Sequence, residues 1–237
     1  VKVETTNTTR VANTSPTAAS SAADMNGKAT EIACQQIWER LREVAAGILD
    51  HPNPRDIEMK NESIYLQGKK TDLHWEKLVN DAYWKRVNLS AQGYYATPGI
   101  YFDRGKEKGK PFAYHVFGTS IFEVTLDGLR GTYEIDAVRV VHDAGRSINP
   151  LIDRGQAEGG IIQGIGWMTM EELLYNKDGR LLTDSTGTYK VPDIKSIPKV
   201  VEVQFLEEAE NPYAVMSSKA IGEPPFMYGI GVYFAII

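Results

Sequence analysis

Residues 155–167 read GQAEGGIIQGIGW, with apolar residues at helical spacing and five glycines in the first twelve positions. Each glycine inside a helix costs about 1 kcal/mol relative to alanine, so something must come close to this backbone. The neighbour is either another segment of the chain, packed tightly on the helix, or a ligand held by the amides of Gln156 and Gln163. A dinucleotide-binding fingerprint does not fit, because its glycines belong to a turn between a strand and a helix.

The rest of the chain places this stretch in a mixed fold. Apolar residues recur at helical spacing from Ala18 to Ile48, which predicts an amphipathic helix of about 30 residues. The glycine stretch belongs to a second long helix, from Leu151 to about Leu174, preceded by Asn149-Pro150. Further signals predict a helix over 73–86, a hairpin over 56–66, and strands over 90–96, 112–126, 133–142, 199–205 and 213–218. Because strands and helices gather in blocks, the fold class is α+β, with mixed sheets and two long helices.

The segment Gly222-Glu223-Pro224-Pro225 is the second unusual feature. A residue before proline avoids the helical region, and proline suits the first helical position, so Glu223 is expected to be extended ahead of a helix that begins at Pro224. One interpretation makes Glu223 a capping carboxylate that the helix dipole stabilises. The other makes it a rigidly held general base whose pKa a dry pocket would raise.

Composition excludes several classes of protein. A net charge of −5 without a basic block does not fit nucleic-acid binding. The single cysteine, Cys34, rules out a disulfide framework or an iron-sulfur cluster held by this chain alone. The four histidines show no metal-ligand spacing, and the longest apolar run is too short to span a bilayer. The cytoplasm is the favoured compartment, the periplasm stays open, and both ends predict a fragment of a longer protein.

Three segments taken together resemble one family. They are VANTSPTAAS at 11–20, the glycine stretch from Gly155 to Gly166, and SKAIGEPP at 218–225. In this order they resemble the molybdenum hydroxylases, and most closely the C-terminal molybdopterin-binding domain of xanthine dehydrogenase and aldehyde oxidase. The resemblance covers nearly all of residues 1–237, with a possible break into two subdomains near 90–150.

The resemblance implies a molybdenum ion held by the dithiolene sulfurs of molybdopterin and not by protein side chains. Glu223 matches the family's general base, which deprotonates a water-derived oxygen that then attacks an electron-poor carbon. Gln156 matches a glutamine that hydrogen-bonds the cofactor, and Gln163 is a weaker candidate. The remaining cofactor contacts implied are backbone and hydroxyl donors at Thr17, Ala18, Ala19, Ser20 and Ser21.

The resemblance also implies partners. The family's large subunit has an upstream half that completes the site, and its electrons leave through iron-sulfur clusters and FAD on partner domains or subunits. The complete protein is expected to be an oligomer that acts on a small molecule, and the isolated chain to bind little or no molybdenum and to be inactive. Two alternatives stay open: a noncatalytic assembly module in which Glu223 only caps a helix, and aldehyde oxidation in place of purine hydroxylation.

Overall fold

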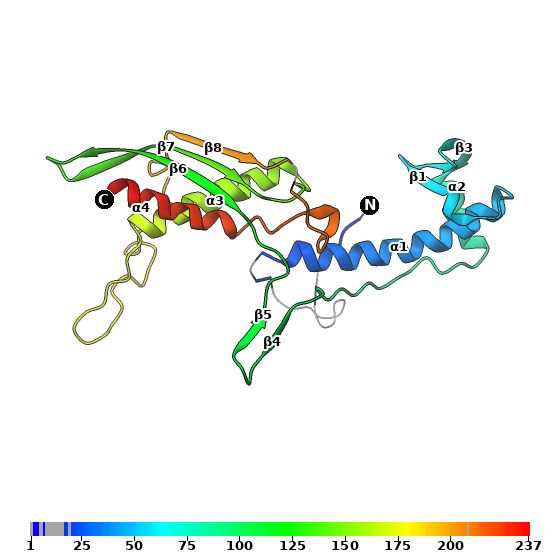
Figure 1. The fold of residues 1–237 in the computed structure, drawn as a ribbon, viewed down its shortest axis with the longest axis horizontal. Coiled ribbons are helices and arrows are strands. Elements are labelled where there is room, and N and C mark those ends of the chain that lie inside the picture. The colour runs from blue at the N-terminus through cyan, green and yellow to red at the C-terminus, as the bar shows by residue number, and fades with distance from the viewer. Residues whose placement is uncertain (1, 5–6, 8–16, 19, 208) are drawn as a thin grey trace. The chain divides into compact units, whose positions relative to one another are not determined.

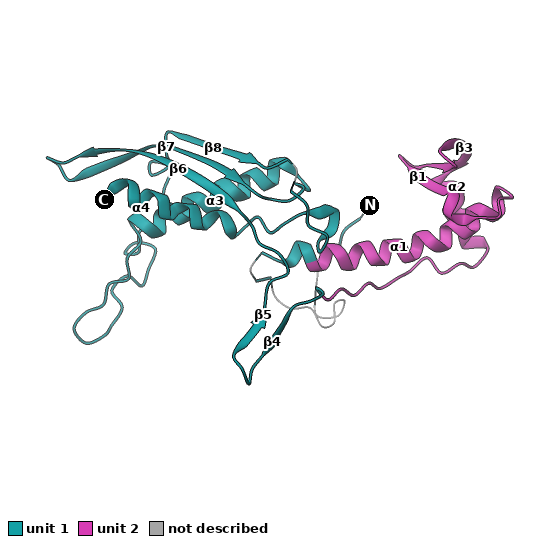
Figure 2. Ribbon diagram, viewed as in Figure 1, with its two compact units in different colours: residues 1–24, 97–237 teal, residues 25–96 magenta. Residues whose placement is uncertain are grey.

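A computed structural model describes residues 2–4, 7, 17–18, 20–207 and 209–237. These residues form two compact units, which are described separately (Figure 2). The smaller unit consists of residues 25–96, and the larger unit consists of residues 97–237 with the described residues up to 24. The boundary at residue 24 falls in the first turn of the long helix α1 (Ala22–Ile48).

The smaller unit packs helices on a small antiparallel sheet. The sheet has the order β1 (Ile57–Lys60), β2 (Ser63–Leu66) and β3 (Lys69–His74), and helix α2 (Trp75–Trp84) follows it. A short 3-10 helix, η1 (Pro54–Asp56), precedes the sheet. The core consists of fully buried side chains from α1, the sheet and α2: Leu41, Ala45, Ile57, Ile64, Leu78 and Ala82. The predicted long helix and hairpin are therefore confirmed, whereas the predicted start of a helix at residue 73 lies in β3.

In the larger unit, two helices pack on a three-stranded sheet (Figure 1). The sheet has the order β6 (Gly118–Asp127), β7 (Thr132–His142) and β8 (Val200–Phe205); β6 pairs antiparallel with β7, and β8 pairs parallel with it. Helix α3 (Pro150–Thr169), the 3-10 helix η3 (Pro224–Gly229) and helix α4 (Ile230–Ile236) complete the unit's core. That core contains Val138, Val140, Ile161, Ile165 and Val232, all buried. A separate hairpin joins β4 (Tyr101–Asp103) to β5 (Lys108–Lys110).

Other predicted elements also differ from the structure. The strand predicted over 112–126 begins only at Gly118, and the long helix predicted from Ala18 begins at Ala22. Residues 90–96 form no strand in the described structure, because the Gly93 backbone lies against α1, where a Cβ would be 1.8 Å from the Ala29 carbonyl oxygen. Residues 213–218 form no strand in the described structure, because Met216 and Ser217 have φ angles of 53° and 60°, which a strand does not allow. The short element η2 (Val215–Ser217) lies there instead, with Met216 outside helical geometry. The second long helix ends at Thr169 and not near Leu174.

The glycines of α3 have two different surroundings. A Cβ at Gly164 would lie 2.1 Å from the carbonyl oxygen of Phe226, and a Cβ at Gly160 would lie 3.3 Å from that of Gly222. These two glycines therefore let η3 and the segment before it pack directly on the helix backbone. At Gly155 and Gly159, in contrast, no described atom lies within 4 Å of the position that a Cβ would take. Tight packing within the chain thus explains only some of the glycines.

Candidate functional site

The three sequence motifs meet around one cavity of the larger unit. The cavity has a volume of about 230 Å³. Its walls come from the start of α1, from the first turns of α3 and from the segment that leads to Glu223. The lining residues are Thr17, Ser20, Ala23, Ala144, Ile148, Asp153, Gln156, Ser218, Lys219, Ala220, Ile221 and Gly222. The structure therefore brings together three segments that lie far apart in the sequence, residues 17–23, 144–156 and 218–222, which spacing alone did not require.

The chain turns sharply just before α1. Ser20 has a φ of 53°, and Ser21 donates from its Oγ to the carbonyl oxygen of Ala18 over 2.9 Å. This turn brings the Ser20 side chain to Gly222, where an added Cβ would lie 2.9 Å from the serine Oγ. Of the five predicted residues, Thr17 and Ser20 line the cavity, Ala18 and Ser21 lie beside it in the sequence, and Ala19 is outside the described residues.

Helix α3 presents Gln156 to the cavity. Its N-cap is Asn149, whose side chain accepts a hydrogen bond from the amide of Ile152, and Pro150 fills the first helical position. Gln156 follows in the second turn, and its Oε1 lies 3.5 Å from the place where a Cβ on Gly222 would be. Gln163, two turns further, is exposed and lies outside the cavity lining found among the described residues. Only one of the two predicted glutamines therefore reaches the cavity.

Glu223 differs from its predicted geometry in two ways. Its backbone is helical, with φ −95° and ψ −40°, because its carbonyl oxygen accepts the amide of Phe226 at 3.0 Å and closes the first turn of η3. The side chain is exposed, so the described residues do not supply the predicted dry pocket. Within the described part of the chain, the Glu223 side chain makes no hydrogen bond that caps η3. The carboxylate instead follows directly after the cavity-lining Gly222.

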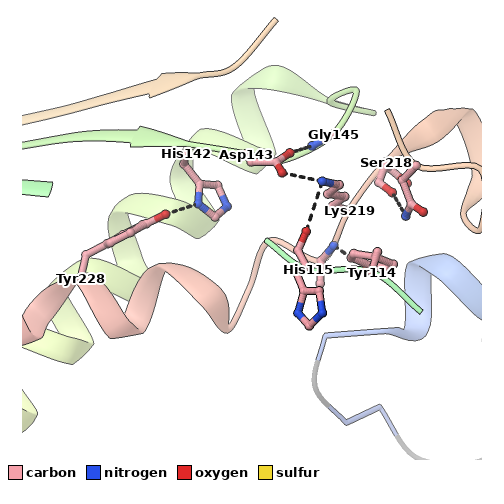
Figure 3. A network of polar contacts seen from close by, with 10 residues as sticks. Tyr114, His115, His142, Asp143, Gly145, Ser218, Lys219 and Tyr228 are labelled. Carbon is pink, nitrogen blue, oxygen red and sulfur yellow. Dashed lines mark hydrogen bonds and ion pairs between the residues drawn. The ribbon is translucent and has the colours of Figure 1, made fainter. Parts of the chain in front are cut away.

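A buried polar network holds the segment before Glu223 (Figure 3). The Lys219 ammonium lies 2.5 Å from the Asp143 carboxylate and also donates to the carbonyl oxygen of His115 at 3.2 Å. The Tyr114 hydroxyl accepts from the amide of Ala220 at 2.9 Å and donates to the Asp24 carboxylate at 2.5 Å. Burial raises the pKa of Asp24 above 3.8, while its bond from Tyr114 opposes this shift.

A second buried pair lies at the end of β7. His142 is fully buried, and its Nδ1 is 2.7 Å from the hydroxyl of Tyr228 in η3. Burial lowers the pKa of His142 and raises that of Tyr228 to about 12. Gly118 makes this contact possible, because a Cβ there would lie 1.8 Å from the tyrosine hydroxyl. Among the described residues, the His142 Nε2 has no hydrogen-bond partner.

The sequence does not show how the members of these two networks pair. The charged residues Asp143 and Lys219 are 76 positions apart, and nothing in their local sequence shows that they pair. The available signal was the presence of titratable residues at the end of an apolar strand and inside the SKAIGEPP motif. Such residues are costly to bury without partners, so a partner could have been sought for each.

The described residues offer neither a metal-ligand cluster nor a membrane-spanning helix. No cluster of three or more His, Cys, Asp or Glu side chains within the described ranges could hold a metal ion. The helices that the structure describes include none that is long and apolar enough to cross a membrane.

Comparison with known proteins gives one family and several relatives. The family described as the molybdopterin cofactor-binding domain matches residues 1–198. The chain is 39% identical to a xanthine dehydrogenase from Oryza sativa subsp. japonica over 241 residues, covering 99% of this chain and 16% of the relative. It is also 39% identical to a xanthine dehydrogenase/oxidase from Rattus norvegicus, covering 100% of this chain and 16% of the relative. The chain thus spans about a sixth of these relatives' length.

Solved structures share the fold at lower sequence identity. A reconstituted CO dehydrogenase from Oligotropha carboxidovorans has a TM-score of 0.76 at 21% identity, over 93% of this chain and 26% of that one. Quinoline 2-oxidoreductase from Pseudomonas putida 86 has a TM-score of 0.69 at 21% identity, over 85% of this chain and 25% of that one. These likenesses confirm the α+β fold of a molybdopterin-binding domain.

Proposed function

Because the chain belongs to the molybdopterin cofactor-binding domain family, we propose that it forms part of a molybdenum-dependent hydroxylase in which Glu223 is the general base. Two observations support the proposal: the identity of 39% to xanthine dehydrogenases over the whole chain, and the cavity at which the three motifs meet. The predicted resemblance to the molybdenum hydroxylases is confirmed at the level of the family. The assignment of individual residues is our proposal.

We propose that the cavity holds part of a polar pterin. Its lining is built mainly from small side chains, which leave room, while Thr17, Ser20 and Gln156 offer two hydroxyls and an amide as hydrogen-bonding groups. The nearby start of α1 adds backbone N–H groups that the helix itself does not use. We propose that these groups hold the cofactor and that Ala18, Ala19 and Ser21 contribute backbone or hydroxyl donors beside them. Gln163 is the weakest of the proposed contacts, because it lies away from the cavity.

When bound, the molybdenum cofactor accepts the two electrons that a hydroxylation with water-derived oxygen releases. The chain's own contribution is to place a proton acceptor beside that reaction. Glu223 follows Gly222 at the rim of the cavity, and Pro224 and Pro225 limit the conformations of the backbone that carries it. An ionised carboxylate in this place can accept the proton of the attacking water-derived group. The alternative role as a helix cap would rest on the helix dipole alone, because Glu223 occupies the N-cap position of η3 but its side chain makes no capping bond among the described residues.

We propose a purine as substrate, since the relatives with 39% identity are named xanthine dehydrogenases. Oxidation of an aldehyde is the alternative outcome of the substrate assay. The relatives are about six times as long as this chain, so we also propose that an upstream part of the same subunit completes the site and that other domains or subunits carry iron-sulfur clusters and FAD. A cytoplasmic location is proposed on the single cysteine, Cys34, and cell fractionation tests it.

The full-length enzyme with Glu223→Ala tests the proposed base. We expect turnover of xanthine and hypoxanthine to fall at least about 100-fold while the molybdenum content stays near that of the unchanged enzyme, because only the proton acceptor is lost. A panel of aldehydes assayed in parallel separates the two substrate classes. Glu202→Gln is the matched control, because Glu202 is an exposed carboxylate of the same unit that pairs with Arg139 on the sheet. Near-normal turnover by the Glu223 variant would contradict the proposal.

A further inference from the structure

The segment from Ser218 to Gly222 forms one wall of the cavity and leads directly to Glu223. Its position decides where the Glu223 carboxylate lies. Pro224 follows Glu223, and Gly222 before it lies so near Ser20 that a Cβ there would be 2.9 Å from the serine Oγ. The contacts that fix this segment therefore bear on the proposed reaction, although none of them involves Glu223 itself.

Lys219 is the charged residue of this segment. Its side chain is 9% exposed and that of Asp143 is 5% exposed, so the two charges form a buried ion pair. The ammonium uses a second donor on the carbonyl oxygen of His115 (Figure 3). Burying an ammonium without such partners would cost several kcal/mol in folding free energy. The two acceptors therefore fix the position of the lysine side chain.

Asp143 is itself held at the end of the sheet. Its amide donates to the carbonyl oxygen of Phe117 at 2.8 Å, and its Oδ1 accepts from the amide of Gly145 at 3.0 Å. Gly145 has a φ of +60°, and a Cβ there would lie 2.4 Å from the carbonyl oxygen of Ser217. The turn after β7 therefore touches the backbone just before Lys219, and the ion pair connects the segment to the rigid end of the sheet.

Backbone hydrogen bonds hold the same segment on both sides. The amide of Lys219 donates to the carbonyl oxygen of Ala144 at 3.0 Å, and Asn211 donates from its side chain to the carbonyl oxygen of Ser218 at 2.7 Å. On the other side, the amide of Ala220 donates to Tyr114, which is bonded in turn to Asp24. The Lys219 side chain therefore acts together with these backbone contacts in holding the segment.

We propose that Lys219 is a positioning residue for the reaction: its buried ion pair with Asp143 fixes the path of the chain from Ser218 to Gly222 and thereby the place of the Glu223 carboxylate. The inference rests on the proposed role of Glu223. A general base must lie within hydrogen-bond reach of the proton that it accepts, and a displacement of about 1 Å can cost about 100-fold in rate.

A direct role for Lys219 in binding is the competing explanation, because the residue also lines the cavity. Its ammonium already has a carboxylate and a carbonyl oxygen as acceptors, both from this chain. The two explanations differ in what they predict. Loss of a positioning residue lowers kcat and leaves KM and molybdenum content unchanged, whereas loss of a binding contact raises KM or lowers the molybdenum content.

The test uses the full-length enzyme with Lys219→Met combined with Asp143→Asn. This double variant removes both buried charges, so no unpaired carboxylate is left to unfold the unit. We expect kcat per bound molybdenum to fall at least about 10-fold, with KM and molybdenum content within about twofold of the unchanged enzyme. Lys199→Met is the matched control and should leave kcat unchanged. Lys199 also pairs with two carboxylates of the larger unit, at 2.7 and 2.8 Å, but its side chain is 61% exposed.

Each other outcome overturns the inference. Unchanged kcat in the folded double variant would show that the pair is only structural, and a raised KM or lost molybdenum would show a binding contact. If the double variant does not fold, Tyr114→Phe removes the bonds to Ala220 and Asp24 and should lower kcat per molybdenum at least about threefold at constant KM. An unchanged kcat there also overturns the inference. Activity that survives in Glu223→Ala is a different result, because it defeats the proposed base whatever the Lys219 variants do.

Discussion

Gly164 and Gly159 lie on the same helix, five positions apart, in opposite surroundings. The backbone of η3 closes over Gly164, whereas no described atom lies within 4 Å of the Cβ position at Gly159. Both glycines weaken the isolated helix by about the same amount, about 1 kcal/mol relative to alanine. On the closed side, packing of η3 offsets this cost within the chain itself. On the open side the described residues offer no such compensation, and Gly159 is exposed.

The largest effect is expected on the closed side, from Gly164→Val. The new Cβ would lie 2.1 Å from the carbonyl oxygen of Phe226, a backbone atom that cannot move without displacing η3. We expect a loss of about 3 kcal/mol in the free energy of unfolding. Urea denaturation followed by circular dichroism measures it, and Gly159→Val provides the control on the open side. Equal losses in the two variants would contradict the comparison.

A smaller effect concerns pH, because the buried pair of His142 and Tyr228 holds η3 on the same closed side. Burial keeps the pKa of His142 below its ordinary value of 6.5. At and below that ordinary value, the unfolded state therefore binds more protons at this residue than the folded state does. Its contribution to stability is present above pH 6.5 and is lost as the pH falls through the lower folded pKa.

The expected change is at most about 1.4 kcal/mol per pH unit for this one group. Thermal denaturation at about pH 7.5 and about pH 5.5 measures it, with His142→Phe as the variant that no longer titrates. We expect the difference between the two pH values to be smaller in the variant than in the unchanged protein. The same difference in both proteins would exclude His142 as its source.

The smallest change in stability is expected on the open side, from Gly159→Ala. With no described neighbour to collide with, the alanine should raise the free energy of unfolding by about 0.5 to 1 kcal/mol. In the full-length enzyme we expect the same change to lower the molybdenum content if the cofactor approaches the exposed side of α3 at Gly159. Elemental analysis checks this, and an unchanged content together with a gain in stability would show that the open side is not used.

Much of the fold could be predicted from local patterns. The hairpin of β1 and β2, the strands β7 and β8, and the start of α3 after Asn149 all follow from alternation, turn residues and capping. Strand β3 was missed because its sequence, KKTDLH, has little apolar alternation, and only its pairing with β2 makes it a strand. The strand predicted over residues 90–96 does not form, for the opposite reason. They carry strand-forming side chains but lie along a helix instead of beside another strand.

The candidate site was likewise predicted only in part. The motifs around Ser20, Gln156 and Gly222 were recognisable as an ordered set in the sequence, and the structure brings all three to one cavity. The extended conformation predicted for Glu223 was wrong. The first 3-10 turn of η3 sets the backbone angles of this residue, and its side chain is exposed.

The sequence by itself determined the two long helices, the hairpin over 56–66 and the family, because these depend on periodicity and on short motifs that each lie within a few turns of chain. Only the tertiary structure decided which glycines of α3 are packed and which are open, since that depends on where η3 comes to lie. It alone paired Lys219 with Asp143, 76 positions away, and Tyr114 with Asp24, 90 positions away. The physical reason is that a buried charge must find its partner in space, wherever the fold places it, and no local pattern in the sequence records that choice.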